Sequence, residues 1–359
     1  MRLNGRSEVN VEALLHRARW APSGDNAQPW RFRITAANTV EVSADDTADE
    51  VIYDYKGEAS MLAAGALLET FRLAALAVGH EMHETPREGS GSRVARELQF
   101  APADKEHDPL ADVIESRVTN RRAFSSRRLA VEHVTALEEA LPTGYGLVLR
   151  HTWVDRWRIA RMLWRNAGIR LTTPEVFTVH RDVVDWGVKE SVDRIPAPAV
   201  GLDPVLLRMM RWAMTSWRRV DVLNRYFGGT VLPRLELDLL PGLLCGAHFV
   251  LTAPRPPETD QDLLDAGAAM QRLWLQAAAL DIQFQATYSP LVFRKYVRAS
   301  TPFTCAARPW EAAQRLADEL DGEYGAETLD RAVFMGRLGY GQSPSARSVR
   351  LPLEKLLRS

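Results

Sequence analysis

The chain has 359 residues, 46% of them hydrophobic and 25% charged, which suits a globular protein with a sizeable core and room for two units. Its formal net charge of −1 gives no bulk electrostatic attraction to nucleic acid or to an acidic membrane surface, so we expect neither partner. Two cysteines are too few for a disulfide framework or a cysteine-rich metal site, and we expect no metal.

The chain opens without a targeting pattern. Residues 1–6 are polar and lack the apolar core of a signal peptide. No uncharged apolar run further along the chain reaches membrane-spanning length. The expected location is therefore the cytoplasm.

The first distinctive stretch is a turn bounded by prolines, between a helix and a strand. Helix formers over residues 11–20 stop at Pro22, and the alternating pattern of residues 30–34 predicts a strand. Ser23 and Asn26 place a hydroxyl and an amide on this turn, which suits the edge of a planar, hydrogen-bonding heterocycle. On composition alone, an ordinary helix-to-strand turn is the simpler interpretation.

The remainder of the first hundred residues predicts a buried helix between strands. Residues 40–43 and 96–100 have the pattern of short strands. Residues 58–78 are rich in alanine and apolar on most faces, so they predict a helix in the middle of the fold. The polar stretch 102–109 is bracketed by prolines and is the best candidate for a linker.

This linker divides the chain into an N-terminal unit, residues 1–108, and a C-terminal unit, residues 109–359. The second unit opens on a basic turn, continues through residues 151–240 with six of the ten tryptophans interleaved with arginines, and ends in a tail rich in Gly, Ser and Pro. Its other predicted elements are helices at 110–117, 131–141 and 260–280 and strands at 246–252 and 329–339.

Internal similarity points to two related units. A shift of 120 residues aligns residues 22–24 with 142–144, and a shift of 202 aligns the two alanine-rich helices, placing Gly65 on Gly267. Residues 25–29 have no equivalent in the second copy, and the basic turn has none in the first. Each copy therefore retains a different half of one site, unless the two helices are unrelated and merely similar in composition.

The stretch APSGDNAQPWRF, residues 21–32, resembles the nitroreductase-family motif, whose members bind FMN and exchange electrons with NAD(P)H. Such proteins are typically homodimers with FMN at the subunit interface, where one subunit presents this turn to the flavin ring and the other binds the phosphate. The resemblance covers most of residues 10–150 and 245–359. The chain therefore resembles a tandem member, a fused pseudo-dimer with one complete flavin site.

The resemblance implies a fold and a set of site residues. The fold is α+β, with two nitroreductase-like units that each have a mixed β-sheet flanked by helices, plus a helical insertion. The ring side is assigned to Pro22, Ser23, Gly24, Asn26 and Gln28. The basic turn assigned to the phosphate contains Arg117, Thr119, Asn120, Arg121 and Arg122, with the choice between the last two open. The remaining residues are Thr287, Tyr288 and Ser289, which are assigned to one face of the flavin, and Arg347 and Arg350, which are the basic residues near the end of the chain.

The residue types fit that assignment chemically. Guanidinium groups make charge-assisted, bidentate hydrogen bonds to a phosphate monoester, although a single arginine is more often a solvated surface charge. In such enzymes the cofactor carries the reaction, so no dedicated catalytic residue is expected. The leading hypothesis is an FMN-dependent oxidoreductase in which NAD(P)H reduces FMN, which then reduces a small organic acceptor (nitro, quinone-like or pathway-specific).

Two other functions remain open. One is a flavin-sequestering protein whose lid blocks nicotinamide, and the other is a flavin oxidase or dehydrogenase of a biosynthetic pathway that never uses nicotinamide. The insertion at 151–240 has three interpretations: nucleic-acid binding, a membrane-surface helix within residues 205–222, and a lid over the flavin, which we favour. The fused pseudo-dimer is expected to be a monomer or to form a further homodimer.

Overall fold

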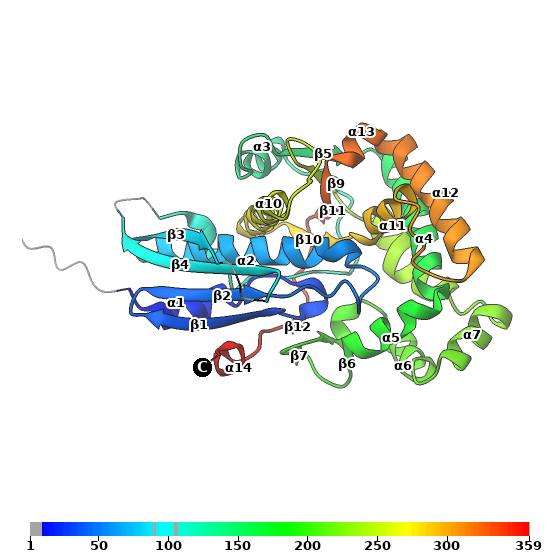
Figure 1. Cartoon of the computed structure of the whole chain (residues 1–359). Coiled ribbons are helices and arrows are strands. Elements are labelled where there is room, and N and C mark those ends of the chain that lie inside the picture. Colours follow the sequence, from blue (N-terminus) through cyan, green and yellow to red (C-terminus); the bar gives the residue numbers. More distant parts are fainter. Residues whose placement is uncertain (1–8, 88, 90, 104–106, 359) are drawn as a thin grey trace, which may run out of the picture.

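Figure 1 shows the computed structural model, which describes residues 9–87, 89, 91–103 and 107–358. The polar opening residues and the centre of the predicted linker, residues 104–106, lie outside the described residues. Helices and two antiparallel sheets make up the fold, so the predicted α+β class is confirmed.

The first sheet lies in the N-terminal half. Its strand order is β1-β2-β4-β3, and every neighbouring pair is antiparallel. The apolar residues Trp30 and Phe32 of β1 are fully buried against the helices. The elements of this half are α1 (Val11–Ala18), β1 (Trp30–Ala36), β2 (Thr39–Ala44), α2 (Glu58–Leu76), β3 (His80–Pro86) and β4 (Val94–Pro102).

The second sheet repeats this order. Its strands run β5-β9-β11-β10, again antiparallel, and a long helix separates the second from the third strand in sequence, as α2 does in the first half. The elements are α3 (Val131–Glu139), β5 (Gly146–Arg150), β9 (Ala247–Thr252), α10 (Asp260–Ala279), β10 (Gln283–Ala286), α11 (Ser289–Arg298), α12 (Ala307–Tyr324), α13 (Ala326–Asp330) and β11 (Ala332–Gly339).

The expectation of mixed sheets is wrong for these two sheets. Strands joined by short hairpins, such as β1 and β2, pair antiparallel because the chain reverses between them. Parallel pairing occurs elsewhere, where the C-terminal segment returns to the first half. Phe32 of β1 forms a parallel bridge with Leu357, just after α14 (Leu353–Leu356), so the end of the chain covers the edge of the first sheet.

Helices α2 and α10 pack against each other through two glycines (Figure 1). A Cβ on Gly65 would lie 2.0 Å from the carbonyl oxygen of Leu264, and a Cβ on Gly267 would lie 2.2 Å from that of Leu62. Both pairs of equivalent residues are 202 positions apart, so the contact is reciprocal, as in a two-fold symmetric interface. The backbones of the two helices therefore meet directly.

Burial explains the composition of α2. Residues 55–76 form a helix long and apolar enough to cross a membrane, but 83% of its most apolar window is buried inside the fold. Neighbours on several sides, α1, α10 and strands of the first sheet, remove the need for a polar face. We therefore describe it as a core helix.

Residues 151–240 are predominantly helical, as predicted. The first helix, α4, packs on α12 and α9, and the capping box of Thr152 and Asp155 fixes where it begins. Figure 1 shows the helices of this region at the end of the molecule away from β3 and β4. They are α4 (Trp153–Thr172), α5 (Pro174–Val183), α6 (Pro204–Ala213), α7 (Trp217–Tyr226), α8 (Val231–Arg234) and α9 (Leu240–Leu243), with the π-helical turn Leu235–Leu239 before α9.

A loop, residues 184–201, connects α5 to α6 and contains a 3-10 turn, Ala197–Val200. Its short strand β7 (Glu190–Ser191) pairs with β12 (Arg347–Ser348) of the C-terminal segment. A second pairing, β6 (Val184–Asp185) with β8 (Ile195–Pro196), closes the loop on itself. This loop and the C-terminal segment both reach the turn that follows α1.

Candidate functional site

The turn at residues 22–28 has an unusual backbone. Asp25, Asn26 and Gln28 have φ angles of 49°, 65° and 50°, the left-handed region that Asn and Asp tolerate better than most residues. The backbone N–H of Gln28 donates to Oγ of Ser23 at 3.0 Å, which closes the turn. Pro22 is buried before the turn, and Gly24 has open space where a Cβ would be. The polar motif therefore forms a rigid turn.

The two amides of the motif bind other parts of the chain. Nδ2 of Asn26 donates to the carbonyl of Val349 at 3.0 Å. Nε2 of Gln28 donates to the carbonyl of Val192 at 2.8 Å, and its Oε1 accepts from the N–H of Leu351 at 2.9 Å. Both side chains are buried. They join the turn to the loop 184–201 and to the C-terminal segment, so their first role is to hold the turn in place.

Four arginines surround Trp20, directly before the turn. The guanidinium carbons of Arg19, Arg347 and Arg350 lie 5.9, 4.8 and 5.7 Å from the centre of its ring. Arg117 donates to the carbonyl of Trp20 at 3.0 Å. We call these four residues the arginine cluster. Sequence reasoning assigned three of them to the phosphate and missed Arg19.

The arginine cluster forms no salt bridge within the described part of the chain, although the charges of Glu190 and Glu115 act on Arg347. Among the described residues, none of the four forms a salt bridge, and their hydrogen bonds go to neutral oxygens such as Oδ1 of Asn26, which accepts from Arg350 at 2.9 Å. Burial, with a smaller effect of the positive charge of Arg347, lowers the pKa of Arg117 to about 9. Burial and the three neighbouring arginines hold the pKa of Arg350 well below its usual range.

The same cluster has donors without acceptors. The buried Nε–H groups of Arg19, Arg117 and Arg347 have no hydrogen-bond partner among the residues that the structure describes. Leaving buried charged donors unpaired is costly, and a phosphate monoester offers several acceptor oxygens and nearly two negative charges. The residues present therefore fit the phosphate of FMN in charge, in donor chemistry and in burial.

The two neighbouring arginines of the basic turn, Arg121 and Arg122, point in different directions. Arg121 points inward, where its Nη1 donates to the carbonyl of Ala199 at 3.3 Å, whereas Arg122 is exposed. Asn120 is structural, because its amide nitrogen donates to Oε1 of Gln283 at 2.8 Å and its oxygen accepts from the backbone of Arg122. Thr119 is half-buried and forms no side-chain hydrogen bond within the described part of the chain. Of these two arginines, Arg121 is therefore the candidate for the flavin site, and it lies near Asp25 of the turn, whose charge acts on it.

A buried arginine that the sequence reasoning missed positions this turn. Arg337 of β11 donates to the carbonyl oxygens of Arg121 and Arg122 at 3.1 and 2.6 Å. Its Nε donates to Oε1 of Gln285 on β10 at 2.5 Å. Burial lowers the pKa of Arg337 to about 9. In sequence this arginine lies in an apolar strand pattern with no motif around it, so no signal marked it.

A group of ionisable side chains lies between the turn and the insertion. Burial raises the pKa of Asp25, with Arg121 and Arg170 acting against that shift. The Asp25 side chain is also exposed at the surface of the turn. The hydroxyl of Tyr53 lies 3.1 Å from Nε2 of His180 on α5, which connects the insertion to the first half. Burial, with a smaller effect of Arg170, lowers the pKa of His180 to about 3, so this ring is neutral.

The segment after α10 has the geometry expected of a tight turn. Asp281, at a position where glycine would be more usual, has φ of 52°. The ring of Tyr288 stacks on Phe334 with centroids 5.6 Å apart. Oγ1 of Thr287 is buried without a partner, whereas Oγ of Ser289 accepts from Asn166 of α4 at 2.9 Å. Of the three predicted residues, Thr287 has a buried polar atom without a partner among the described residues, and the hydroxyl of Tyr288 forms no hydrogen bond there either.

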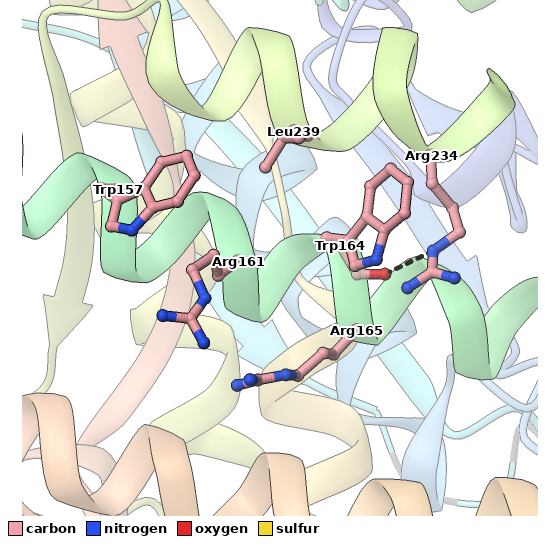
Figure 2. A pocket seen from close by; sticks show the side chains of 6 residues that line it. All are labelled: Trp157, Arg161, Trp164, Arg165, Arg234 and Leu239. Atoms are coloured by element: carbon pink, nitrogen blue, oxygen red, sulfur yellow. Dashed lines mark hydrogen bonds between the residues drawn. The ribbon is translucent and has the colours of Figure 1, made fainter. Parts of the chain in front are cut away.

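A pocket on the surface of the insertion contains none of the predicted site residues. Figure 2 shows this pocket, where the guanidinium of Arg234 lies 4.0 Å from the ring centre of Trp164 and donates to its carbonyl at 2.8 Å. The pocket has a volume of about 390 Å³ and is lined by Trp157, Arg161, Trp164, Arg165, Arg234 and Leu239. Its contacts stabilise the insertion, so we do not place the flavin there.

No family model matches the chain. Two curated relatives, both named "Putative NAD(P)H nitroreductase acg", come from the CDC 1551 / Oshkosh and ATCC 25618 / H37Rv strains of Mycobacterium tuberculosis. Each is 36% identical to this chain over 112 residues, which are 29% of the chain and 33% of the relative. The matched stretch thus spans about a third of the length of these relatives.

Solved structures with some similarity are also nitroreductase-like by name. A nitroreductase with bound FMN from Bacteroides fragilis has 11% identity and a TM-score of 0.33, over 66% of this chain and 89% of that one. A nitroreductase-like protein from Bacillus cereus has 12% identity and a TM-score of 0.35, over 72% of this chain and 98% of that one. The FMN-dependent nitroreductase NfnB from Mycobacterium smegmatis, in complex with NADPH, has 18% identity and a TM-score of 0.36, over 70% of this chain and 97% of that one. The match to the curated relatives confirms that the chain resembles the nitroreductase family.

Proposed function

We propose that this protein is an FMN-dependent oxidoreductase that takes electrons from NAD(P)H and delivers them to a small organic acceptor of the nitro or quinone-like class. FMN, when bound, supplies the two-electron transfer between donor and acceptor. The observation that carries the proposal is the arginine cluster, whose buried positive charge forms no salt bridge and whose Nε–H groups are mostly unpaired among the described residues. The name of the curated relatives supports the use of NAD(P)H.

Residues of the second half would hold the phosphate. Arg117 follows the linker, and Arg347 and Arg350 lie in the C-terminal segment, so three guanidinium groups from distant parts of the sequence converge on one place. Arg19 adds a fourth from the first half. Converging forks of this kind bind a phosphate from several directions and fix its orientation.

Residues at the turn 22–28 would hold the ring. The rigid turn at 22–28 supplies backbone groups, and Arg121 supplies a cation at the same place, since its charge acts on Asp25. A fixed cation beside the ring supports negative charge that develops on its carbonyl edge. Tyr53 and His180 would hold the insertion against the first half beside the ring, since the Tyr53 hydroxyl lies 3.1 Å from Nε2 of His180.

Both halves of the chain contribute to this one site. The turn belongs to the first half and the phosphate arginines mainly to the second, as in a homodimer whose subunits have been fused. The repeated strand order and the reciprocal contact of Gly65 and Gly267 support this arrangement. We therefore propose a fused pseudo-dimer of residues 1–108 and 109–359 with a single flavin site, located in the cytoplasm.

A second candidate function rests on the loop 184–201. Its carbonyl groups accept hydrogen bonds from Gln28 and Arg121, so the insertion covers the turn at residues 22–28 directly. A lid held this firmly favours a flavin-sequestering protein if it also excludes nicotinamide. A flavin oxidase that does not use nicotinamide would share the same cover.

The visible spectrum of the purified protein tests these functions. We expect a yellow protein that releases FMN on denaturation and that anaerobic NADPH bleaches. A colourless protein that cannot be loaded with FMN would contradict the flavin site. A yellow protein that neither NADPH nor NADH bleaches would support sequestration or a different reductant.

A further inference from the structure

Exposed apolar side chains are concentrated on the insertion. Fifteen of the nineteen large hydrophobic residues that are exposed lie between Trp153 and Leu244. Eight of them belong to the region of α6, α7 and α8: Val205, Met209, Trp212, Val222, Tyr226, Phe227, Val231 and Leu232. Scattered single residues of this kind are ordinary, but a cluster on one short region marks an interaction surface.

The apolar residues of α6 form one face. Val205, Met209 and Trp212 are spaced by four and three residues, so they lie along the same side of the helix. The adjacent side of the helix, roughly a quarter of a turn away at Leu206 and Ala213, is buried against the protein. The exposed face of α6 is therefore unpartnered within the described part of the structure.

Helix α7 extends this face. None of its residues is buried, and Tyr226 and Phe227 at its end are 75% and 74% exposed. Arg219 connects it to α6, because its guanidinium lies 4.8 Å from the ring centre of Trp212. Figure 1 shows α6 and α7 at the outer edge of the molecule, away from both sheets. We call the exposed face of residues 204–227 the α6–α7 face.

The charge of the α6–α7 face is strongly positive. Residues 204–227 contain five arginines and one acid, Asp221, although the whole chain has a net charge of −1. Asp221 pairs with Arg225 at 2.8 Å, which leaves four arginines without an acidic partner among them. The four are Arg208, Arg211, Arg218 and Arg219. Arginines next to exposed Trp, Tyr and Phe are typical of helices that lie in a bilayer interface.

We propose that the α6–α7 face docks on the surface of an anionic lipid bilayer. The aromatic and aliphatic side chains would enter the boundary between headgroups and acyl chains, and the arginines would contact the lipid phosphates. A second copy of this chain fits the face less well, since a two-fold contact would bring the same arginines against each other. The whole-chain charge predicts no membrane partner because it averages over this local patch.

Flotation of the full-length protein with lipid vesicles tests the proposal. The protein is expected to float with vesicles of phosphatidylcholine and phosphatidylglycerol and to stay behind with phosphatidylcholine alone. High salt is expected to release it, because the arginines act through a screened charge interaction. Absence of flotation with the phosphatidylglycerol vesicles at low salt would overturn the proposal.

Variants at exposed positions locate the contact. Replacing Arg208 and Arg218 by glutamine is expected to lower the vesicle partition coefficient roughly thirtyfold, from the usual effect of two cations near an anionic surface. Phe227→Ser is expected to lower it roughly tenfold through lost apolar burial. Arg128→Gln and Val131→Ser are matched controls at exposed positions outside the insertion and should bind as the unmodified protein does.

Three further outcomes would overturn the proposal. The first is flotation that the arginine and Phe227 variants do not weaken. The second is equal weakening by the two control variants. The third is a dimer in solution that Phe227→Ser converts to a monomer without any vesicle binding, which would assign the α6–α7 face to a second copy of the chain. All substituted side chains are exposed, so circular dichroism should show unchanged folding.

Discussion

Replacing Gly267 by alanine tests the direct contact of α2 and α10. The new Cβ would lie 2.2 Å from the carbonyl oxygen of Leu62 and 3.0 Å from the amide nitrogen of Ala66. Ordinary contact begins near 3.4 Å, so the two backbones would have to separate by about 1.2 Å. Both contacted atoms are backbone atoms inside a helix, which cannot rotate out of the way.

The size of the effect follows from two opposing contributions. Overpacking a tight interior costs about 1–3 kcal/mol, and the backbone clash places this substitution at the upper end. Alanine recovers about 1 kcal/mol over glycine inside a helix. The net loss is therefore about 2 kcal/mol, which corresponds to a fall in Tm of about 3 °C for a chain of this length if it unfolds cooperatively.

Thermal or urea unfolding measures this loss. Gly322→Ala in α12 is the matched control, because that glycine has nothing within 4 Å of the new Cβ and should become slightly more stable. Gly65→Ala should cost about as much as Gly267→Ala, since its Cβ would lie 2.0 Å from the carbonyl oxygen of Leu264. The double variant should lose less than the sum, because one separation relieves both clashes. A Gly267→Ala protein as stable as the Gly322→Ala control would refute the reciprocal contact.

Three further predictions concern the site and the pH dependence of folding. Arg121→Ala should weaken FMN binding at least tenfold, whereas Arg122→Ala should leave the affinity unchanged, as measured by fluorescence titration. Equal effects of the two substitutions would contradict the inward placement of Arg121. Tyr53→Phe removes the hydrogen bond to His180, worth about 1 kcal/mol, so hydrogen exchange in the loop 184–201 should speed up roughly fivefold. His248 has its pKa lowered by burial to about 4, so the unfolded chain binds more protons below pH 6.5. Its contribution to stability should therefore rise by about 3 kcal/mol from pH 4 to 6.5 and stay constant above, a slope that His248→Gln should reduce.

The sequence predicted the elements whose pattern is local. The alanine-rich stretch that became α2 is apolar on all sides because it is buried on all sides, and α10 follows the same logic. The turn at residues 22–28 was identifiable because its proline, glycine and polar residues are contiguous. The helical character of the insertion was likewise readable from its residues, although its place in the fold was not.

Elements that depend on distant partners were missed or wrongly bounded. The strand β3 carries mostly charged and polar residues and shows no strand pattern, since it is an edge strand defined by its pairing with β4. The predicted helix at 110–117 is only a short 3-10 turn, Pro109–Val113. The end of the chain gave no sign that Leu357 would pair with Phe32.

The residues of the candidate site divide in the same way, into those that a local motif marks and those that depend on distant partners. Arg117, Arg347 and Arg350 were found because motifs marked them, whereas Arg19 and Arg337 stand among ordinary residues and act through contacts across the fold. The pairing of Tyr53 with His180 joins segments 127 residues apart, one of them in an insertion without a recognisable motif. Tertiary structure alone brings these side chains together.

Comparison of FMN with riboflavin tests the arginine cluster most directly. Riboflavin presents the same ring without the phosphate, so a titration of the flavin-free protein with each ligand isolates the contribution of the cluster. Two charge-assisted hydrogen bonds gained by the phosphate correspond to roughly hundredfold tighter binding of FMN. We predict at least that ratio, and its loss when Arg117 is replaced by methionine. Equal affinity for the two ligands, or binding of neither, would contradict the site proposed here.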